Sequence, residues 1–520
     1  MTFHRSGPIG GAAVLAATAL VVMGLSACTT SGGGDPASTT VADANLEAIV
    51  RVAAPLEPTT LDPIKSLGRQ TRVTEQLFDA LVGRDAEGAP DDTGLLTSWE
   101  RVDDTTWEFT LRQEVTFHDG SDFTAEDVVY TMEQGKIEPA APYGSFYKRV
   151  VSAEAIDDAT VVMKTAAPDN SLPAVLTVVY PVPSDYYAEV GTAGFEQNPI
   201  GTGPFVFDSR QPGQSLSLAR FDDYWGDVAK VAGVRFTFSA DAAGRASLLQ
   251  SGDVDIVYDL PQQSLAELEA SDSVHIESAP VASLVNMLVR AQEAPLDDAE
   301  LREAVSLAVD REALIELIYG ENAIPVNKYA TFILPDVPDQ DIPYDLKRAQ
   351  EIVSEHGGSP EIGLTYSTGA FPQDKAMGEA IAAMLTEAGF TVRQEILEVS
   401  KIIQRMREGG AGMNVWILQS DTTIPHPEVV VSFYLAEGAI PNFCVDQKEY
   451  SALSARGREA RDEESMQAAY EDLDKKVLTE DHCYVPLAQT VASYGVANTV
   501  RDFAVPLTGS PDFAAVSMSK

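Results

Sequence analysis

The sequence Phe-His-Asp-Gly-Ser-Asp-Phe-Thr-Ala-Glu-Asp-Val-Val-Tyr-Thr-Met occupies residues 117–132 and predicts the end of a strand, a turn and a capped helix. Before it, residues 106–117 alternate apolar and polar side chains, which is typical of a half-buried strand. The Asp-Gly pair at 119–120 supplies the turn, because glycine tolerates the positive φ that most residues avoid. Thr124 can then cap a helix, with Asp127 completing a capping box.

The same residues resemble a signature of extracellular solute-binding protein family 5, the substrate-binding proteins of peptide and nickel ABC importers. The family pattern is F-x-D-G-x-x-F-x-A-x-D-V. Further segments resemble the family in the family's own order, at residues 60–63, 199–205, 301–320 and 416–425. The resemblance covers essentially all of the chain after its N-terminal leader. It implies an α/β, two-lobed periplasmic-binding-protein-like fold (type II, large peptide-binding class) with a hinge between the lobes.

The length of the chain agrees with that organisation. A chain of 520 residues exceeds what one hydrophobic core usually supports, so two or more lobes are expected. Residues 283–290 are apolar on both faces, as a strand in the centre of a sheet would be, and the resemblance puts the lobe boundary there. It implies lobe I at 46–282 with an inserted subdomain at about 76–190, lobe II at 283–485, and a return to lobe I at 486–520.

The charge of the chain argues against one class of partner. The sequence has 79 Asp and Glu residues against 36 Lys and Arg residues, a formal net charge of −43. Nucleic-acid binding needs a basic face that displaces counterions from phosphates, so no nucleic-acid partner is expected. The acidic surface either serves solubility alone or also attracts cationic ligands, because a field of one sign concentrates ions of the opposite sign.

The N-terminus predicts export and a lipid anchor. An apolar run at 12–25 is too short to span a bilayer comfortably and has the form of a secretory signal. Leu-Ser-Ala-Cys at 25–28 resembles a bacterial lipobox, which implies removal of residues 1–27, acylation of Cys28 and attachment to the extracytoplasmic face of the cell membrane. The alternative is an incidental cysteine after an ordinary signal peptide. Residues 28–45 then form a flexible tether.

Two further cysteines, Cys444 and Cys483, remain in the mature chain. In an exported protein such a pair suggests a disulfide, and a metal site is the alternative. No His or Cys has the short ligand spacing that zinc sites use. His426 flanks the 416–425 segment and is a weak candidate metal ligand, although a lone histidine is more often structural. We therefore expect no metal and no cofactor.

The ligand site is expected at residues 416–425, Trp-Ile-Leu-Gln-Ser-Asp-Thr-Thr-Ile-Pro. In the family a strand ending in W-x-W-x-x-D-x-x-D-P lies at the cleft, and an ungapped match puts Trp416 on the first tryptophan and Asp421 on the first aspartate. The resemblance implies that Asp421 neutralises the α-ammonium of a peptide, a charge-assisted hydrogen bond that is strong in a dry cleft. Alternatively Asp421 caps the following turn. Ser420 and Thr422 flank it and are assigned to the same site.

Several residues depart from the family pattern. Leu418 and Ile424 replace the second tryptophan and the second aspartate of the motif. The dipeptide binders that the chain resembles hold the ligand carboxylate with an arginine in a loop that corresponds to 367–374, and the sequence has no arginine between Arg348 and Arg393. The sequence therefore does not predict a two-ended clamp on a dipeptide. A longer peptide gripped through its backbone, or a cationic non-peptide solute, would tolerate the absence.

The sequence contains no motif that predicts an enzyme. It lacks G-x-S-x-G and H-E-x-x-H, and the glycine-rich residues 201–205 lack the lysine of a phosphate-binding loop, so they predict a tight turn. We expect a monomeric, lipid-anchored substrate-binding protein that delivers a solute, most simply a peptide, to an ABC permease. Binding of a nickel chelate or another cationic small solute is the alternative, and a secreted hydrolase is less expected.

Overall fold

The computed structural model describes residues 45–520, except for 67–70, 261, 330–336, 369, 422–423, 436–442 and 446. The leader, Cys28 and the proposed tether up to residue 44 lie outside the described residues, as does Thr422. No helix in the described part is long and apolar enough to cross a membrane.

Within the described residues, eleven strands form one large sheet, in the order β15-β14-β16-β12-β17-β11-β1-β10-β9-β8, with β13 beside β17. The strands, in chain order, are β1 (Ile49–Ala54), β8 (Phe205–Gln211), β9 (Ser215–Arg220), β10 (Gly233–Phe238), β11 (Ile256–Val257), β12 (Val274–Val289), β13 (Ala323–Pro325), β14 (Glu361–Ser367), β15 (Thr391–Leu397), β16 (Val415–Asp421) and β17 (Tyr484–Ala497).

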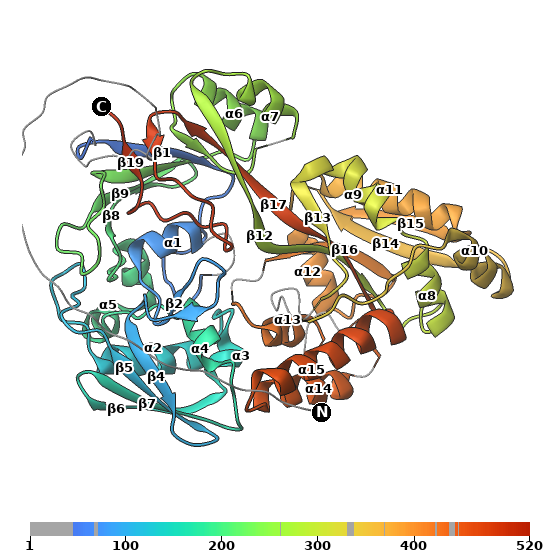
Figure 1. Cartoon of the computed structure of the whole chain (residues 1–520), viewed down its shortest axis with the longest axis horizontal. Coiled ribbons are helices and arrows are strands. Elements are labelled where there is room, and N and C mark those ends of the chain that lie inside the picture. Colours follow the sequence, from blue (N-terminus) through green and yellow to red (C-terminus); the bar gives the residue numbers. More distant parts are fainter. Residues whose placement is uncertain are drawn as a thin grey trace, which may run out of the picture. The chain divides into compact units, whose positions relative to one another are not determined.

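Two long antiparallel strands, β12 and β17, connect the two ends of this sheet (Figure 1). Their pairing runs from Val274 opposite Ala497 to Leu288 opposite Tyr484. The register shifts between Pro280 and Leu284 and again between Val285 and Asn286. Such a shift marks a bulge, which bends the strand locally. Before the bulge β17 pairs with β11, and after it β12 pairs with β16. The strands therefore pass from one group of neighbours to the other at this irregularity.

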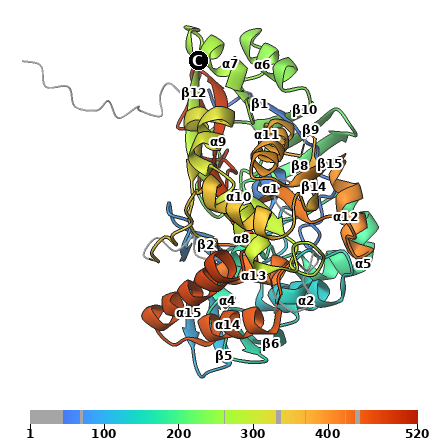
Figure 2. The same ribbon diagram turned by 90° about the vertical axis from the view of Figure 1, so that its right-hand side faces the viewer.

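Helices cover both faces of the sheet around β16. Side chains alternate along β16, so that Val415 and Ile417 join one hydrophobic cluster, whereas Trp416 and Leu418 join another. The first cluster includes residues of α8 (Ala299–Leu307), α9 (Arg311–Ile318), α10 (Leu346–Glu355) and α11 (Asp374–Glu387). The second includes residues of α12 (Val399–Arg407), α13 (Pro427–Tyr434), α14 (Gln447–Glu459) and α15 (Glu463–Lys475), of which the last two lie side by side (Figure 2).

The 117–132 stretch packs against a separate four-stranded sheet. Its order is β4-β5-β7-β6, and α2 packs against β6 and β7. Phe117, Phe123, Val128 and Met132 are buried in its core, as the sequence pattern indicates. The elements of this region are β4 (Leu96–Arg101), β5 (Thr106–Leu111), α2 (Ala125–Ile137), α3 (Gly144–Tyr147), β6 (Val150–Asp157), β7 (Thr160–Thr165) and α4 (Leu172–Val175).

The remaining elements are short or lie at the edges of these layers. They are α1 (Thr71–Leu77), β2 (Gly83–Arg84), β3 (Pro90–Asp91), α5 (Ser184–Gln197), α6 (Ala242–Gln250), α7 (Gln262–Glu269), β18 (Val500–Arg501), β19 (Ser517–Met518), the short 3₁₀ helices Leu176–Val178 and Gly320–Asn322, and the π-helix Lys476–Glu480.

The histidine of the quoted stretch fastens the small sheet to the glycine-rich turn. His118 Nδ1 accepts a hydrogen bond from Gly201 N at 3.1 Å, so Nε2 carries the proton and donates to Gly203 O at 3.0 Å. Only glycine fits at residue 201, because an added Cβ would lie 2.1 Å from the carbonyl oxygen of Leu77. The turn thus packs against the backbone of Leu77, and β8 begins directly after the turn at Phe205.

Candidate functional site

Asp421 is the last residue of β16, and two neighbouring side chains orient its carboxylate. Ser283, its partner on β12, donates from Oγ to Asp421 Oδ1 at 2.6 Å. Gln419, two residues earlier on the same face of β16, donates from Nε2 to Ser283 Oγ at 2.6 Å and to Asp421 Oδ1 at 3.3 Å. Asp421 itself is exposed although Ser283 is buried. The arrangement holds an accessible negative charge in a fixed direction.

The Asp421 carboxylate also influences a tyrosine on the helix that follows. Tyr434 is the last residue of α13, and its pKa is raised first by burial and then by the negative charge of Asp421. A cation beside Asp421 would therefore lie within the electrostatic reach of an aromatic hydroxyl. Such a combination of carboxylate and phenol suits an ammonium group, which needs both charge and hydrogen-bond acceptors.

Two of the predicted ligand residues face the interior. Ser420 accepts a hydrogen bond on Oγ from Asn286 Nδ2 at 3.0 Å, and both residues are buried. Trp416 is 7% exposed, with its ring centroid 6.2 Å from that of Phe443. These side chains pack behind Asp421 rather than beside it, because even and odd positions of β16 point to opposite faces. A direct ligand role for Trp416 and Ser420 stays a prediction, and Thr422 lies outside the described residues.

The loop after β14, where an arginine would be needed for a dipeptide clamp, is organised by a carboxylate. Asp374 Oδ2 accepts hydrogen bonds from Ser367 Oγ at 3.2 Å and from Ala370 N at 2.8 Å. Asp374 is buried at the start of α11. The loop therefore presents no cationic side chain of its own to a ligand carboxylate.

His426 has a structural role at the start of α13. Its Nδ1 accepts a hydrogen bond from Glu428 N at 3.2 Å, which makes it the N-cap of the helix. It is 6% exposed, and burial lowers its pKa to about 4. In the described residues, the histidine and carboxylate atoms that lie near enough to share a metal ion belong to Asp298, Glu300 and His356. These three residues form a cluster of ion pairs at the surface.

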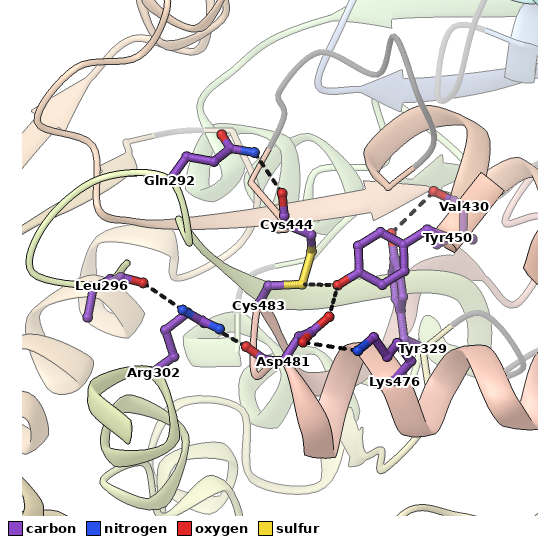
Figure 3. Close-up of a disulfide and its surroundings, with 10 residues drawn as sticks. All are labelled: Gln292, Leu296, Arg302, Tyr329, Val430, Cys444, Tyr450, Lys476, Asp481 and Cys483. Atoms are coloured by element: carbon purple, nitrogen blue, oxygen red, sulfur yellow. Dashed lines mark hydrogen bonds and ion pairs between the residues drawn. A yellow bond between two sulfur atoms is a disulfide. The ribbon is translucent and has the colours of Figure 1, made fainter. Parts of the chain in front are cut away.

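Cys444 and Cys483 form a disulfide in the structure, with their Cα atoms 5.3 Å apart (Figure 3). It ties the segment before α14 to the residue that precedes β17. Gln292 Nε2 donates to the carbonyl oxygen of Cys444 at 2.6 Å, and the hydroxyl of Tyr450 lies 3.6 Å from Cys483 Sγ. The disulfide therefore fixes the position from which the chain enters its return strand.

The residues that orient Asp421 were not anticipated from the sequence. Ser283 and Gln419 are 136 positions apart, and only the pairing of β12 with β16 brings them together. The alternation of β16 could have indicated that Gln419 shares a face with Asp421. Nothing in the sequence around Ser283 indicated its partner.

Comparisons with known proteins agree on the family. A model of bacterial extracellular solute-binding proteins, family 5 (middle), matches residues 92–439. Di/tripeptide-binding protein 1 of Pseudomonas aeruginosa is 24% identical over 490 residues, which cover 86% of this chain and 89% of that protein.

Two solved structures are similar in fold. A dipeptide-binding protein from a Pseudoalteromonas species, in complex with Met-Leu, has a TM-score of 0.80 at 19% identity, covering 91% of this chain and 100% of that one. The oligopeptide-binding protein AppA of Bacillus subtilis, in complex with a nonapeptide, has a TM-score of 0.78 at 19% identity, covering 92% and 100%.

Proposed function

Since the chain belongs to family 5 of the bacterial extracellular solute-binding proteins, we propose that it captures a peptide between two lobes and delivers it to the permease of an ABC importer. The family predicted from the sequence is confirmed by the match over residues 92–439. The predicted two-lobed α/β fold of type II is confirmed by the likeness to solved peptide-binding proteins. Family membership implies an extracytoplasmic location, and the family and fold are those of carriers and not of enzymes.

The observation that carries the peptide proposal is the oriented carboxylate of Asp421. It is exposed, it is held by Ser283 and Gln419, and it lies at the end of β16, which has β14 on one side and β12 on the other. A carboxylate fixed in this way can accept the α-ammonium of a peptide without first losing its own side-chain entropy. The relative named above is a di/tripeptide-binding protein, and the two similar structures hold Met-Leu and a nonapeptide, which supports the same class of ligand.

The carboxyl end of the ligand is proposed to be held without an arginine in the loop after β14. Asp374 occupies that loop, and the sequence has no arginine between Arg348 and Arg393. A free carboxylate brought close to Asp374 would be repelled. Peptides of three or more residues, held through backbone hydrogen bonds, place this end farther away. The proposal is therefore for tripeptides or longer peptides with a free N-terminus.

The lobes are proposed as lobe I at 46–282, with an inserted subdomain at about 76–190, lobe II at 283–485 and the return to lobe I at 486–520. The bulge in β12 between Pro280 and Leu284 supports a hinge there, because a register shift bends the strand locally. The protein is further proposed to act as a monomer that is attached to the membrane through Cys28.

A thermal-shift experiment on the purified exported protein tests the function. The probes are the tripeptide Ala-Ala-Ala, a pool of tetrapeptides to nonapeptides, their N-acetylated forms, nickel with histidine, and spermidine. We expect stabilisation by the free peptides, by about 2.7 kcal/mol at a concentration of 100 times the dissociation constant. Stabilisation by the nickel complex or by spermidine, with none from any peptide, would contradict the proposal.

A further inference from the structure

Two segments that are distant in sequence meet at an ion pair between a partly buried arginine and a buried carboxylate. Arg149, between α3 and β6, donates from one guanidinium nitrogen to Glu428 Oε1 at 3.0 Å, in the first turn of α13. Glu428 is 3% exposed. Its carboxylate also accepts from Arg458 at 2.8 Å, from the hydroxyl of Ser432 at 2.8 Å and from that of Ser454. Of these four donors, Arg149 is the one that comes from the region of the small four-stranded sheet, directly before β6.

Arg149 is itself fixed by residues of its own region. Its Nε atom lies 3.3 Å from Asp169 Oδ2, and another guanidinium nitrogen donates to Ser171 Oγ at 3.0 Å. The guanidinium lies 4.6 Å from the centroid of the Phe146 ring, a cation–π distance. The side chain is therefore aimed at Glu428 before the two regions meet.

Neutral contacts surround the ion pair. Asn170 donates from its backbone nitrogen to Arg458 O at 2.9 Å and from Nδ2 to Gly457 O at 2.9 Å. The ring of Phe433 on α13 lies 6.3 Å from that of Phe146, the ring beneath the Arg149 guanidinium. Ile424, which precedes α13, and Val429 of α13 belong to the hydrophobic cluster of the small sheet. The contact thus has a charged centre and an apolar margin.

The charges of this contact balance on each side separately. Arg149 has Asp169 in its own region, and Glu428 has Arg458 in its own region. Burial alone would raise the pKa of Glu428, but Arg458 and Arg149 together lower it, so the carboxylate stays ionised. Removing one member of a buried ion pair is costly because the other is left uncompensated. Here separation of the two regions leaves neither charge without a partner, which is what a contact that opens and closes requires.

The position of the contact connects it to the candidate ligand site. Under the proposed boundaries the chain passes between the lobes only in β12 and β17, near the bulge after Pro280. Asp421 pairs with Ser283 beside this bulge, and Glu428 follows Asp421 by seven positions. A short segment of chain therefore connects the proposed hinge, the proposed ligand anchor and the ion pair.

We propose that the Arg149–Glu428 contact is a latch between the inserted subdomain and lobe II, which holds the lobes closed and so sets how tightly the carrier retains its solute. Arg149 is then a positioning residue that acts on the solute through closure and does not touch it. The inference rests on the proposed function, because closure has a purpose only in a protein that captures a solute.

Hydrogen–deuterium exchange of the purified exported protein, without added solute, tests the latch. In Arg149→Gln we expect the amides of residues 143–150, 424–433 and 457–460 to exchange about tenfold faster or more, the factor that corresponds to about 1.4 kcal/mol. The sheet cores around β5 and β14 should keep their protection, and the radius of gyration from small-angle scattering should increase. Arg149→Lys keeps the charge but loses the forked geometry, so its amide exchange rates in these segments should lie between those of wild type and Arg149→Gln.

The matched control is Arg461→Gln, since Arg461 also crosses the interface, to Asp104, but both side chains are exposed and such a pair contributes little. Asn170→Ala is a second test variant, because it removes hydrogen bonds of the same contact without disturbing a buried charge. Equal exchange of the three segments in wild type, Arg149→Gln and Asn170→Ala would overturn the latch. Uniform loss of protection in both variants, with an unchanged radius of gyration, would show a merely structural role. Neither outcome depends on which solute binds, so a failed peptide screen and a failed latch remain distinguishable.

Discussion

Ser283 of β12 lies directly opposite Asp421 of β16, and its hydroxyl donates to the Asp421 carboxylate at 2.6 Å. Because β12 is also one of the two strands that connect the ends of the large sheet, the proposed ligand anchor is fastened to the strand that would bend on opening. A change in the bend near residue 283 would therefore change the direction of the carboxylate. Ligand affinity and lobe geometry are expected to depend on each other through this one hydrogen bond.

Asp421→Asn keeps the shape of the side chain and removes its charge. If Asp421 meets a ligand ammonium, binding of a free tripeptide should weaken by roughly 2 to 5 kcal/mol, the cost of leaving a buried cation unpaired. Isothermal titration calorimetry measures the change. The N-acetylated peptide should bind wild type poorly and should lose less in the variant.

Two further variants sharpen this test. Ser283→Ala keeps the charge but releases the carboxylate, so it should cost about 1 to 3 kcal/mol of binding. Asp185→Asn removes an exposed acid on α5 and serves as the charge-matched control with no expected effect. Unchanged affinity in Asp421→Asn would reject the amine-anchor role even though the fold is established.

Acid should destabilise the protein through His118 and His426. Burial is the main cause that lowers the pKa of each to about 4, below the value of about 6.5 in an unfolded chain. Their contribution to stability is complete above pH 6.5 and is lost as the pH falls toward 4, by up to about 3 kcal/mol for each group. Urea unfolding at pH 7 and pH 5 should show less of this loss in His118→Gln than in wild type. His275→Gln, a change at a partly exposed histidine, is the control, and an equal loss in both variants would contradict the assignment.

Asp79 should have the opposite pH dependence. Burial raises its pKa to about 6, although Trp225 Nε1 at 2.7 Å and the Tyr224 hydroxyl at 2.8 Å donate to its carboxylate. A raised acid pKa means that stability is complete below about pH 4 and is lost as the pH rises through 6. The destabilisation caused by Asp79→Asn should therefore shrink by about 1 to 3 kcal/mol between pH 4 and pH 7. If the difference in the free energy of unfolding between variant and wild type stays constant with pH, the raised pKa of Asp79 is refuted.

The Cys444–Cys483 disulfide should contribute substantially to stability. The two residues are 39 positions apart, a loop for which the chain-entropy model gives about 4 kcal/mol. The double variant Cys444→Ser, Cys483→Ser should unfold at a correspondingly lower urea concentration. Mass mapping of unreduced protein should recover both cysteines in one linked peptide. Recovery of both as alkylated free thiols, from protein never exposed to reductant, would contradict the pairing.

Membrane attachment is expected to depend on Cys28. Cys28→Ala removes the thiol that the lipobox resemblance assigns to acylation, so the protein should move from the membrane fraction to the soluble fraction. Fractionation followed by immunoblotting measures this. Retention of the variant in the membrane at the wild-type level would remove the lipoprotein proposal.

Much of the secondary structure could be predicted because its local signals were strong. The helix predicted after Thr124 begins at Ala125, and the Asp127 carboxylate accepts a hydrogen bond from the backbone nitrogen of Thr124, as in a capping box. The predicted strand at 106–117 ends earlier, at Leu111, and its last residues instead form an isolated bridge between Thr116 and Asp122. Apolar and polar side chains continue to alternate after Leu111, so the pattern alone could not show where the strand ends.

Other elements could not be predicted because their signals are not local. The strand predicted at 283–290 in fact begins at Val274. Residues 274–280 were missed because most of them are not fully buried, and they are held in the sheet by pairing with the distant end of β17. Helix α14 was not anticipated because few of its residues are apolar, and tertiary packing against α15 stabilises it. The 421 carboxylate was predicted from its resemblance to a motif, whereas its partner Ser283 depended on strand pairing.

The place of β17 in the large sheet has a consequence for biogenesis. β17 lies between β12 and β11, yet residues 484–497 follow every other strand of that sheet in the sequence. During synthesis and export from the N-terminus, both groups of strands must wait for this late segment before their shared centre can close. The exported chain therefore stays incompletely folded, and open to chaperones and proteases, until its last strands have emerged.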